Sequence, residues 1–385
     1  MKRNGRLAFV AKAIRTFCYG SLGVLFPIYL TQLGVDAKGL GLALTLTLLS
    51  SALMTYGVRR PSQKYGPRAV LVLLAALTIL SALLFLFFSN PWVIVLAAAL
   101  GNFAVGSGET GPFLSMDQVV LAKDTARHQL TGVMSSYNLV GYAASALGAA
   151  LVGSASVPVH LLFSIFLVAG ILQIGLYALM QSETIPRESV SHPKDMPSLP
   201  ILRKLAVLFG LDAFAGGFVL QSIVLYWFHV RFGLALGPLG WISFGTQLCT
   251  GISLLLAPWL AKRFGLVRTM IFSHLVSNVL LIAVAFAPVV WLAVVLLLSR
   301  HLLSQIDVPT RQSFLMHVVQ DHEREHAATV TNMSRTLAQA ISPSLTGWVM
   351  QAIALSAPFA LGGGLKIGYD LMLYAAVKHL DVRSG

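Results

Sequence analysis

Long apolar stretches recur along the whole chain, and their length is what most limits the folds that it can adopt. Two examples are AVLVLLAALTILSALLFLFF at residues 69–88 and LLFSIFLVAGILQIGLYALM at residues 161–180. Each holds the roughly 20 residues that an α-helix needs to cross about 30 Å of hydrocarbon. Only 11% of the residues are charged, whereas soluble domains average about 25%. The sequence therefore predicts an all-α polytopic membrane protein.

The alternation of apolar runs with short polar loops fits twelve transmembrane helices. Two cysteines, Cys18 and Cys249, fall inside these predicted spans, match no metal-ligand spacing and are expected to be inert packing residues. We place the spans at residues 7–33, 37–58, 69–89, 91–114, 129–153, 157–180, 203–229, 236–260, 268–287, 290–314, 326–350 and 356–378.

The net charge of +13 is a topology signal, because most of the basic residues fall on one side of the predicted bundle. Nineteen of the 27 Lys and Arg lie in the tails and the even-to-odd loops, and the opposite loops hold only Lys38 and Arg231. The positive-inside rule then predicts that both termini are cytoplasmic. This distribution argues against a nucleic-acid partner, and it makes the opening MKRNGRLAFVAKAIR a cytoplasmic tail that enters the first helix.

A polar stretch near the midpoint, QSETIPRESVSHPKDMPSLP at residues 181–200, reads as a linker between two halves. We therefore predict an N-terminal six-helix bundle at 1–180, a cytoplasmic linker at 181–200 and a C-terminal six-helix bundle at 201–385.

A weak internal repeat supports this division. A shift of 197 residues places Pro112, Asp124 and Arg127 on Pro309, Asp321 and Arg324; it also places Gly20 on Gly217 and Arg15 opposite Asp212. The loop sequences QKYGPR and AKRFGLVR pair at a shift of 199. The nearly common offset indicates two pseudo-symmetric bundles.

Six plus six helices, cytoplasmic ends and a parallel repeat resemble the major facilitator superfamily along nearly the whole chain. In that family the loop after the second helix usually reads G-x-x-x-D-R-x-G-R-R/K. The loop GVRRPSQKYGPR keeps Lys64, Gly66 and Arg68, while Gln63 stands at the usual Asp position. The loop after the eighth helix, LAKRFGLVR, also lacks the Asp.

The resemblance does not extend to the drug–proton antiporters of that superfamily. Asn102 and Gly106 stand where helix 4 of the family often has Arg followed by Gly, and Arg300 appears near the equivalent place in the second half. The Gly-Pro motif that marks many of these antiporters in helix 5 is missing from SSYNLVGYAASALGAALVG.

Charged residues inside the predicted spans are costly, at least about 2.5 kcal/mol each at the membrane centre, so they are candidates for function. The resemblance implies that helices 1, 4, 7 and 10, together with 2, 5, 8 and 11, line a central cavity. The charged residues lie on helices 1, 4, 7, 10 and 11: Arg15, Asp212, Arg300 and Arg335 near mid-depth, and Glu109, Asp117, Asp307 and Arg311 nearer the cytoplasm.

Six residues are candidates for binding a substrate. The guanidinium fork of Arg suits carboxylates and phosphates, and three Arg against one Asp at mid-depth predict a cavity with excess positive charge. Alternatively, one or two of these Arg cap backbone carbonyls or pair with Glu109 or Asp307. Asn138 and Gln221 can hydrogen-bond a substrate or bridge helices. The candidates are Arg15, Asn138, Asp212, Gln221, Arg300 and Arg335.

Four residues are candidates for proton coupling or for a gate: Glu109, Asp212, Asp307 and Arg311. Asp307 and Arg311 have the i,i+4 spacing of an intrahelical ion pair. Asp212 either titrates or contacts the substrate, or it forms a static pair with an Arg of its own half. A change of partner could switch its carboxyl between the protonated and ionised forms.

Two further groups have mainly structural readings. Lys366 and Asp370 on helix 12 are also spaced i,i+4 and are predicted to form a structural pair. His317, His322 and His326 in HVVQDHEREH could hold a cytoplasmic metal ion, but a solvated loop explains them equally, and we predict no metal and no cofactor.

The resemblance implies a secondary active transporter that works by alternating access. The mid-depth Arg predict a small organic solute that is anionic or amphipathic, and protons are the expected coupling ion because Asp212, Asp307 and Glu109 can titrate. The alternatives are a uniporter or efflux pump of the same fold, a membrane-embedded enzyme, or a non-transporting receptor. An enzyme is not expected, and no ATP-binding loop occurs. We expect a monomer in the lipid bilayer of a bacterial or archaeal plasma membrane.

Overall fold

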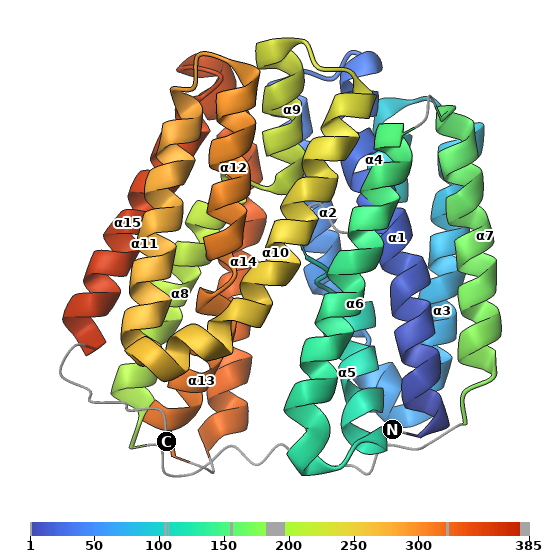
Figure 1. Ribbon diagram of the computed structural model, residues 1–385. Coiled ribbons are helices and arrows are strands. Elements are labelled where there is room, and N and C mark those ends of the chain that lie inside the picture. Colours follow the sequence, from blue (N-terminus) through green and yellow to red (C-terminus); the bar gives the residue numbers. More distant parts are fainter. Residues whose placement is uncertain are drawn as a thin grey trace. The chain divides into compact units, whose positions relative to one another are not determined.

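The computed structural model describes residues 2–103, 106, 108–154, 157–181, 197–320 and 323–377. These residues form fifteen α-helices and no β-strand (Figure 1), as the apolar periodicity predicts. The helices are α1 Arg3–Gln32, α2 Ala37–Gly57, α3 Arg59–Phe87, α4 Pro91–Gly101, α5 Pro112–Asp124, α6 Arg127–Ser154, α7 Val159–Ala178, α8 Leu199–Gly217, α9 Gln221–Phe232, α10 Leu236–Phe264, α11 Leu266–Ala285, α12 Val290–Ser304, α13 Asp307–Val318, α14 Arg324–Ala352 and α15 Ala357–Val377.

Three predicted spans are each broken into two helices, which corrects the continuous helices expected at 91–114, 203–229 and 290–314. The fourth span stops at Gly101 because Asn102 adopts a left-handed conformation with φ of 48°. It resumes at Pro112, which occupies the first turn of α5 after Gly111 with φ of 102°. Proline suits that position because its missing N–H is not needed there.

Eight segments of the described chain are long and apolar enough to cross a membrane. Two of them join helices across a break, α8 with α9 and α12 with α13. The remaining predicted spans are too short or too polar to meet the same criterion. Helix α14, for example, carries Asn332, Arg335 and Gln339 along its length, as expected of a helix that is not surrounded by lipid.

The chain divides into two compact units. One comprises Met1–Glu188 with Gln221–Gln247, and the other comprises Ser189–Leu220 with Leu248–Gly385. The predicted boundary at the 181–200 linker stays a prediction, because residues 182–196 lie outside the described part of the chain.

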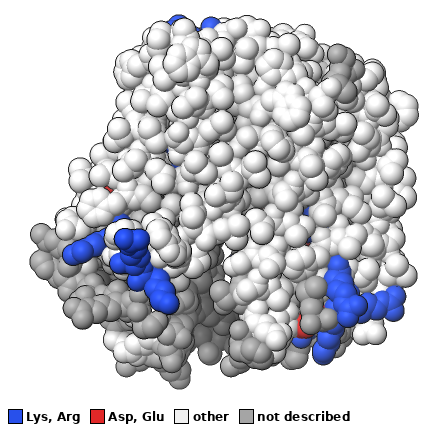
Figure 2. Space-filling model, viewed as in Figure 1, with Lys and Arg blue, Asp and Glu red and all other residues white. Residues whose placement is uncertain are grey.

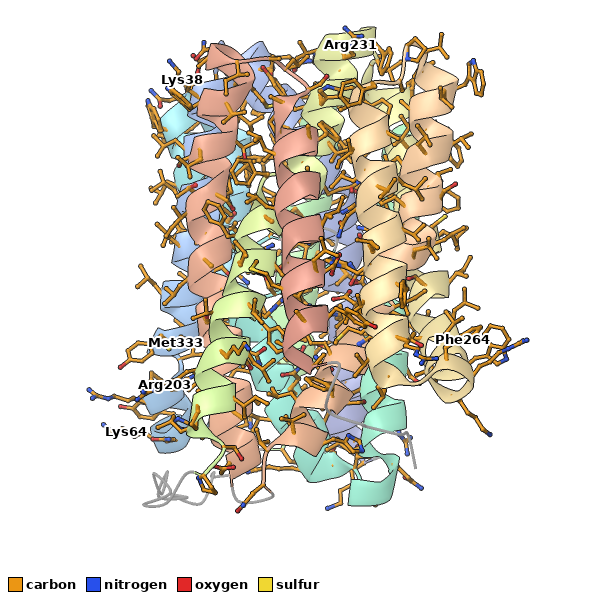
Figure 3. All side chains as sticks on the ribbon, turned by 90° about the vertical axis from the view of Figure 1, so that its left-hand side faces the viewer. Lys38, Lys64, Arg203, Arg231, Phe264 and Met333 are labelled. Atoms are coloured by element: carbon orange, nitrogen blue, oxygen red, sulfur yellow. The ribbon has the colours of Figure 1, made fainter. Side chains whose placement is uncertain are left out.

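The first unit carries exposed basic residues at the end where α1 begins (Figure 2). Arg59, Arg60 and Lys64 are exposed as well. Lys38 and Arg231 lie at the opposite end of this unit from Lys64 (Figure 3). The second unit likewise gathers Lys and Arg where α10 ends and α11 begins (Figure 2). Each unit is therefore asymmetric in charge along its helices.

The internal repeat is visible in the backbone. Gly66 and Gly265, 199 residues apart, both adopt left-handed conformations with φ of 81° and 84°. Gly34 and Gly233, at the same offset, have φ of 84° and 66°. Glycine is suited to this region because it has no Cβ to clash with the backbone. The offset read from the sequence thus matches repeated turns.

Each unit also contains one close helix crossing at equivalent residues. In the first unit a Cβ on Gly20 of α1 would collide with the Ser145 carbonyl of α6. In the second, a Cβ on Gly217 of α8 would collide with the Ser342 hydroxyl of α14. Both pairs differ by 197 residues, so the same small-residue crossing is used twice.

Candidate functional site

Arg15 is the centre of an ion network inside the first unit. Its side chain is 0% exposed, and its Nε donates to Glu109 Oε1. Its Nη1 donates to the Tyr177 hydroxyl at 2.6 Å. Its Nη2 donates to Asp117 Oδ2 at 2.8 Å and to the Tyr137 hydroxyl at 3.3 Å. Arg15, a predicted substrate ligand, is therefore already engaged on every side.

Glu109 links this network to Lys12. The sequence placed Glu109 on a helix, but it lies in the irregular segment between α4 and α5. One of its oxygens pairs with Lys12 and the other with Arg15. The Lys12 ammonium also lies 4.5 Å from the centroid of the Tyr137 ring, a cation–π contact. Two cations and two carboxylates balance each other in the first unit.

A small polar cavity of about 60 Å³ lies beside this network, within the first unit. That volume holds a few water molecules. Asn138, Gln221 and Glu109 all line the cavity, and their role in binding a substrate stays a prediction. Its main polar side chains are Lys12, Glu109, Asn138, Tyr142, Gln221 and Gln247.

The two glutamines of the cavity are only partly hydrogen-bonded. Gln221 Nε2 donates to Thr246 Oγ1 at 3.0 Å. Gln247 Nε2 donates to Ser145 Oγ at 2.9 Å, whereas its buried Oε1 has no hydrogen-bond partner. A buried amide oxygen without a donor is costly, about 1–3 kcal/mol. The cavity wall therefore presents an unused acceptor.

Asp212 on α8 is the centre of a second network, in the second unit. Its Oδ1 lies 2.6 Å from Lys366 Nζ of α15. Its Oδ2 lies 2.8 Å from Arg335 Nη1 of α14 and 3.2 Å from Arg311 Nη1 of α13. Arg335 is the most accessible of the three cations, with a side chain 28% exposed. Asp212 thus pairs with two Arg of its own half in this structure, and its titrating or substrate-contacting role stays a prediction.

The two i,i+4 pairs expected from the sequence differ in outcome. Arg311 Nη1 lies 2.7 Å from Asp307 Oδ2, so this pair forms. The predicted Lys366–Asp370 pair does not form and is corrected, because Lys366 turns to Asp212 instead. Asp370 hydrogen-bonds His274 Nδ1 at 2.7 Å.

His274 is a buried member of the second network that the sequence reasoning missed. It lies on α11, which corresponds to the predicted span at 268–287, a helix that is not among those expected to line the cavity. Its Nδ1 contacts Asp370 and its Nε2 lies 3.6 Å from Asp212 Oδ1. Asn278, one turn later, donates to Asp370 Oδ2 at 3.0 Å. The i,i+4 spacing of His274 and Asn278 was the available signal for this site. Lys12 and Gln247, which line the cavity of the first unit, were also absent from the predicted site residues.

The networks have the same place in the repeat but opposite signs. Arg15 and Asp212 are 197 residues apart in the sequence. The first is a cation surrounded by carboxylates, and the second is a carboxylate surrounded by cations. In the second unit three cations face three carboxylates.

Arg300 is the exception to this balance. No carboxylate of the described chain pairs with it, and its guanidinium contacts His301 Nε2, 3.4 Å from Nη1. The predicted excess of positive charge at mid-depth therefore reduces to Arg300, because Arg15 and Arg335 are paired.

The predicted absence of a metal site stays a prediction. The described residues contain no cluster of three or more His, Cys, Asp or Glu that could hold a metal ion. His317 Nδ1 contacts the Ser313 carbonyl at 2.7 Å. His322 lies outside the described residues.

Comparison with known proteins gives consistent matches over the whole chain. The family described as Major Facilitator Superfamily matches residues 8–343 and, in a second match, 205–380. The uncharacterized membrane protein YJR124C of Saccharomyces cerevisiae is 24% identical over 430 aligned residues, which cover 99% of this chain and 95% of the yeast protein.

Two solved structures share the fold. The nucleoside transporter NupG has a TM-score of 0.76 at 13% identity, covering 98% of this chain and 100% of that one. A D-xylose–proton symporter has a TM-score of 0.73 at 14% identity, covering 96% of each chain. At these identities the likeness concerns the architecture of the helices alone.

Proposed function

This chain belongs to the Major Facilitator Superfamily, and from that premise we propose that it moves a small organic solute across its membrane by alternating access. The family and its structural relatives make the chain a transporter and not an enzyme. In alternating access, two helical bundles rock so that a mid-membrane site opens to each side in turn.

The observation that carries the proposal is the polar cavity of the first unit. Amide, hydroxyl and ammonium groups gather there inside a chain that is 56% hydrophobic. We assign Asn138, Gln221 and Gln247 to hydrogen bonds with the solute. The cavity holds about 60 Å³, whereas ligand pockets usually measure about 300–1,000 Å³. Binding therefore requires the cavity to widen, as an alternating-access cycle would provide.

The coupling ion of this proposal is the proton. Glu109 and Asp212 are the carboxylates we assign to it, because each is held by cations that a proton could replace. Arg335 is the partner of Asp212 we expect to leave, since it is the most accessible one. Asp307 and Arg311 are assigned to the gate, because their pair lies at the start of α13.

A uniporter of the same fold is the second candidate. It is favoured by the balance of charges, because Glu109 and Asp212 are already neutralised without a bound proton.

For the solute we favour an anionic or amphipathic molecule, because Arg300 is a cation without a carboxylate partner in the described chain. We further propose a monomer in a bacterial or archaeal plasma membrane. The basic ends of both units are assigned to the cytoplasm, which places both termini there by the positive-inside rule.

A ligand screen followed by transport measurements tests the function. Purified protein is screened by thermal shift against carboxylates, organic phosphates, sugars and nucleosides, and the ligand that stabilises it is used for counterflow in proteoliposomes. We expect counterflow, with uptake that rises when the outside is acidified. Acidification without effect on uptake contradicts proton coupling and supports the uniporter.

Two variants locate the solute. In Asn138→Ala and in Gln221→Ala, the ligand concentration needed for the same thermal shift should rise at least tenfold. Gln129→Ala, an exposed position on the same helix as Asn138, should leave that concentration unchanged. If all three variants need the same ligand concentration, the cavity does not bind the solute.

A further inference from the structure

Arg300 lies deep in the membrane. It is ten residues beyond Val290, the first residue of α12, and a rise of 1.5 Å per residue places it about 15 Å along the helix. This is about the middle of a hydrocarbon layer roughly 30 Å thick. An arginine at that depth persists only where protein, water or a bound anion satisfies its charge.

The other Lys and Arg of the described spans that lie away from the span ends are each paired with a carboxylate. Lys12 and Arg15 meet Glu109, and Arg335 and Lys366 meet Asp212. Arg311 meets Asp307 and Asp212. No carboxylate of the described residues forms an ion pair with Arg300, whose guanidinium contacts His301 instead. Arg300 is therefore the uncompensated intramembrane cation of the described chain.

His301 does not add a second charge beside Arg300. Because Arg300 Nη1 can only donate, the His301 Nε2 that lies 3.4 Å away must be the unprotonated acceptor. The proton of the ring is then on Nδ1, 3.1 Å from Thr250 Oγ1. Both His301 and Thr250 are buried, so this neutral tautomer holds Nη1 of Arg300 in place.

The unused edge of the guanidinium has the shape of an oxyanion site. Nη1 is taken by His301, whereas Nε is buried without a partner among the described residues. Nη2 makes no hydrogen bond within the described chain. Nε and Nη2 lie on one edge of the planar group and can donate to two oxygens of one carboxylate or phosphate. A single negative charge there neutralises the site.

We infer that Arg300, positioned by His301 and Thr250, binds the anionic group of a small carboxylate- or phosphate-bearing solute. This inference rests on the proposed function for its transport meaning, but binding can be measured without transport. A protein that binds the anion through Arg300 and yet shows no counterflow would refute the function and leave the site standing.

The test is a thermal-shift series on purified full-length protein in a neutral detergent. Sodium benzoate and sodium phosphate are titrated against sodium chloride at matched ionic strength. We expect benzoate or phosphate to raise the unfolding temperature above the chloride reference. Equal shifts with all three salts would overturn the inference and leave only a general salt effect.

The Arg300→Gln variant gives opposite predictions for a ligand site and for a structural arginine. Removing an uncompensated charge from within the span should raise the unfolding temperature without anion and abolish the anion response. Arg300→Lys, which keeps the charge but loses the fork, should weaken the response at least tenfold. Arg263→Gln, an exposed control, should behave like the unmodified protein.

Two results would overturn the assignment. One is a lower unfolding temperature or a failure to fold in Arg300→Gln, because the arginine would then be structural. The other concerns a lipid as the source of the anion. If added phosphatidylglycerol gives an Arg300-dependent shift and the soluble anions do not, the group bound is a headgroup and not that of a solute.

Discussion

Individual charged side chains hold each unit together through complete sets of partners. Lys12, Arg15, Glu109 and Asp117 form one such set, and none of them has its charge left without an opposite one. Removing one member of a buried pair leaves the other uncompensated, which costs about 3–5 kcal/mol. The fold is therefore sensitive to single changes at these positions.

Glu109→Gln should destabilise the first unit strongly. The substitution removes the negative charge that Lys12 and Arg15 share, and we expect a loss of about 3–5 kcal/mol in unfolding free energy. The measurement is thermal unfolding in detergent, followed by intrinsic fluorescence. Thr110→Ala, a change at the exposed neighbouring position that touches no charge, is the control. Equal stability of the two variants would show that the Glu109 pairs contribute little.

Helices approach each other most closely where glycine removes the Cβ. Gly148 of α6 faces the Phe17 carbonyl of α1, and a Cβ at this position would collide with that backbone oxygen. A backbone atom cannot rotate away as a side chain can. The α1–α6 packing therefore depends on the missing methyl group of Gly148 as well as on that of Gly20.

Gly148→Ala should lower the unfolding free energy by about 1–3 kcal/mol, the usual cost of overpacking. Gly132→Ala is the matched control on the same helix, because nothing lies within 4 Å of its added Cβ. Alanine should there gain up to about 1 kcal/mol from helix propensity. Thermal unfolding of the pair is the measurement, and a stabilising Gly148→Ala would contradict the close crossing.

The helices could be predicted from the sequence better than their interruptions. Apolar runs of about 20 residues predict spans, and these correspond to helices in the structure. The break after Gly101 could not be predicted, because the positive φ angles of Asn102 and Gly111 depend on how α4 and α5 pack. Periodicity along the chain does not record such tertiary constraints.

The partners of the charged residues were also only partly predictable. Asp307 and Arg311 pair within one helix, where spacing is enough. Lys366 has the same spacing to Asp370, yet it pairs with Asp212, 154 residues away. Three-dimensional proximity decided between these partners, and a single sequence contains no direct signal for it.

Charge asymmetry along the helices is a property of the whole molecule and predicts its orientation in the membrane. Lys38 and Lys64 lie at opposite ends of the first unit (Figure 3). By the positive-inside rule, we expect the end that carries Lys64 to face the cytoplasm. The sequence predicts this orientation because loop charges, unlike buried contacts, can be counted along the chain.

Cysteine labelling tests the orientation. In a background with Cys18→Ala and Cys249→Ala, a membrane-impermeant maleimide should label Lys38→Cys in intact cells. It should label Lys64→Cys only after the cells are permeabilised. The reverse pattern would show the opposite orientation in the membrane. The protein with only Cys18→Ala and Cys249→Ala, which has no cysteine, measures non-specific labelling.

The opposite signs of the two networks limit how this sequence can change over time. A substitution that removes Asp212 takes an ion-pair partner from three cations. One that removes Arg15 takes an ion-pair partner from two carboxylates. Viable descendants are therefore expected to exchange such residues in compensating sets. Between relatives, these positions should vary together or not at all, while lipid-facing residues drift independently.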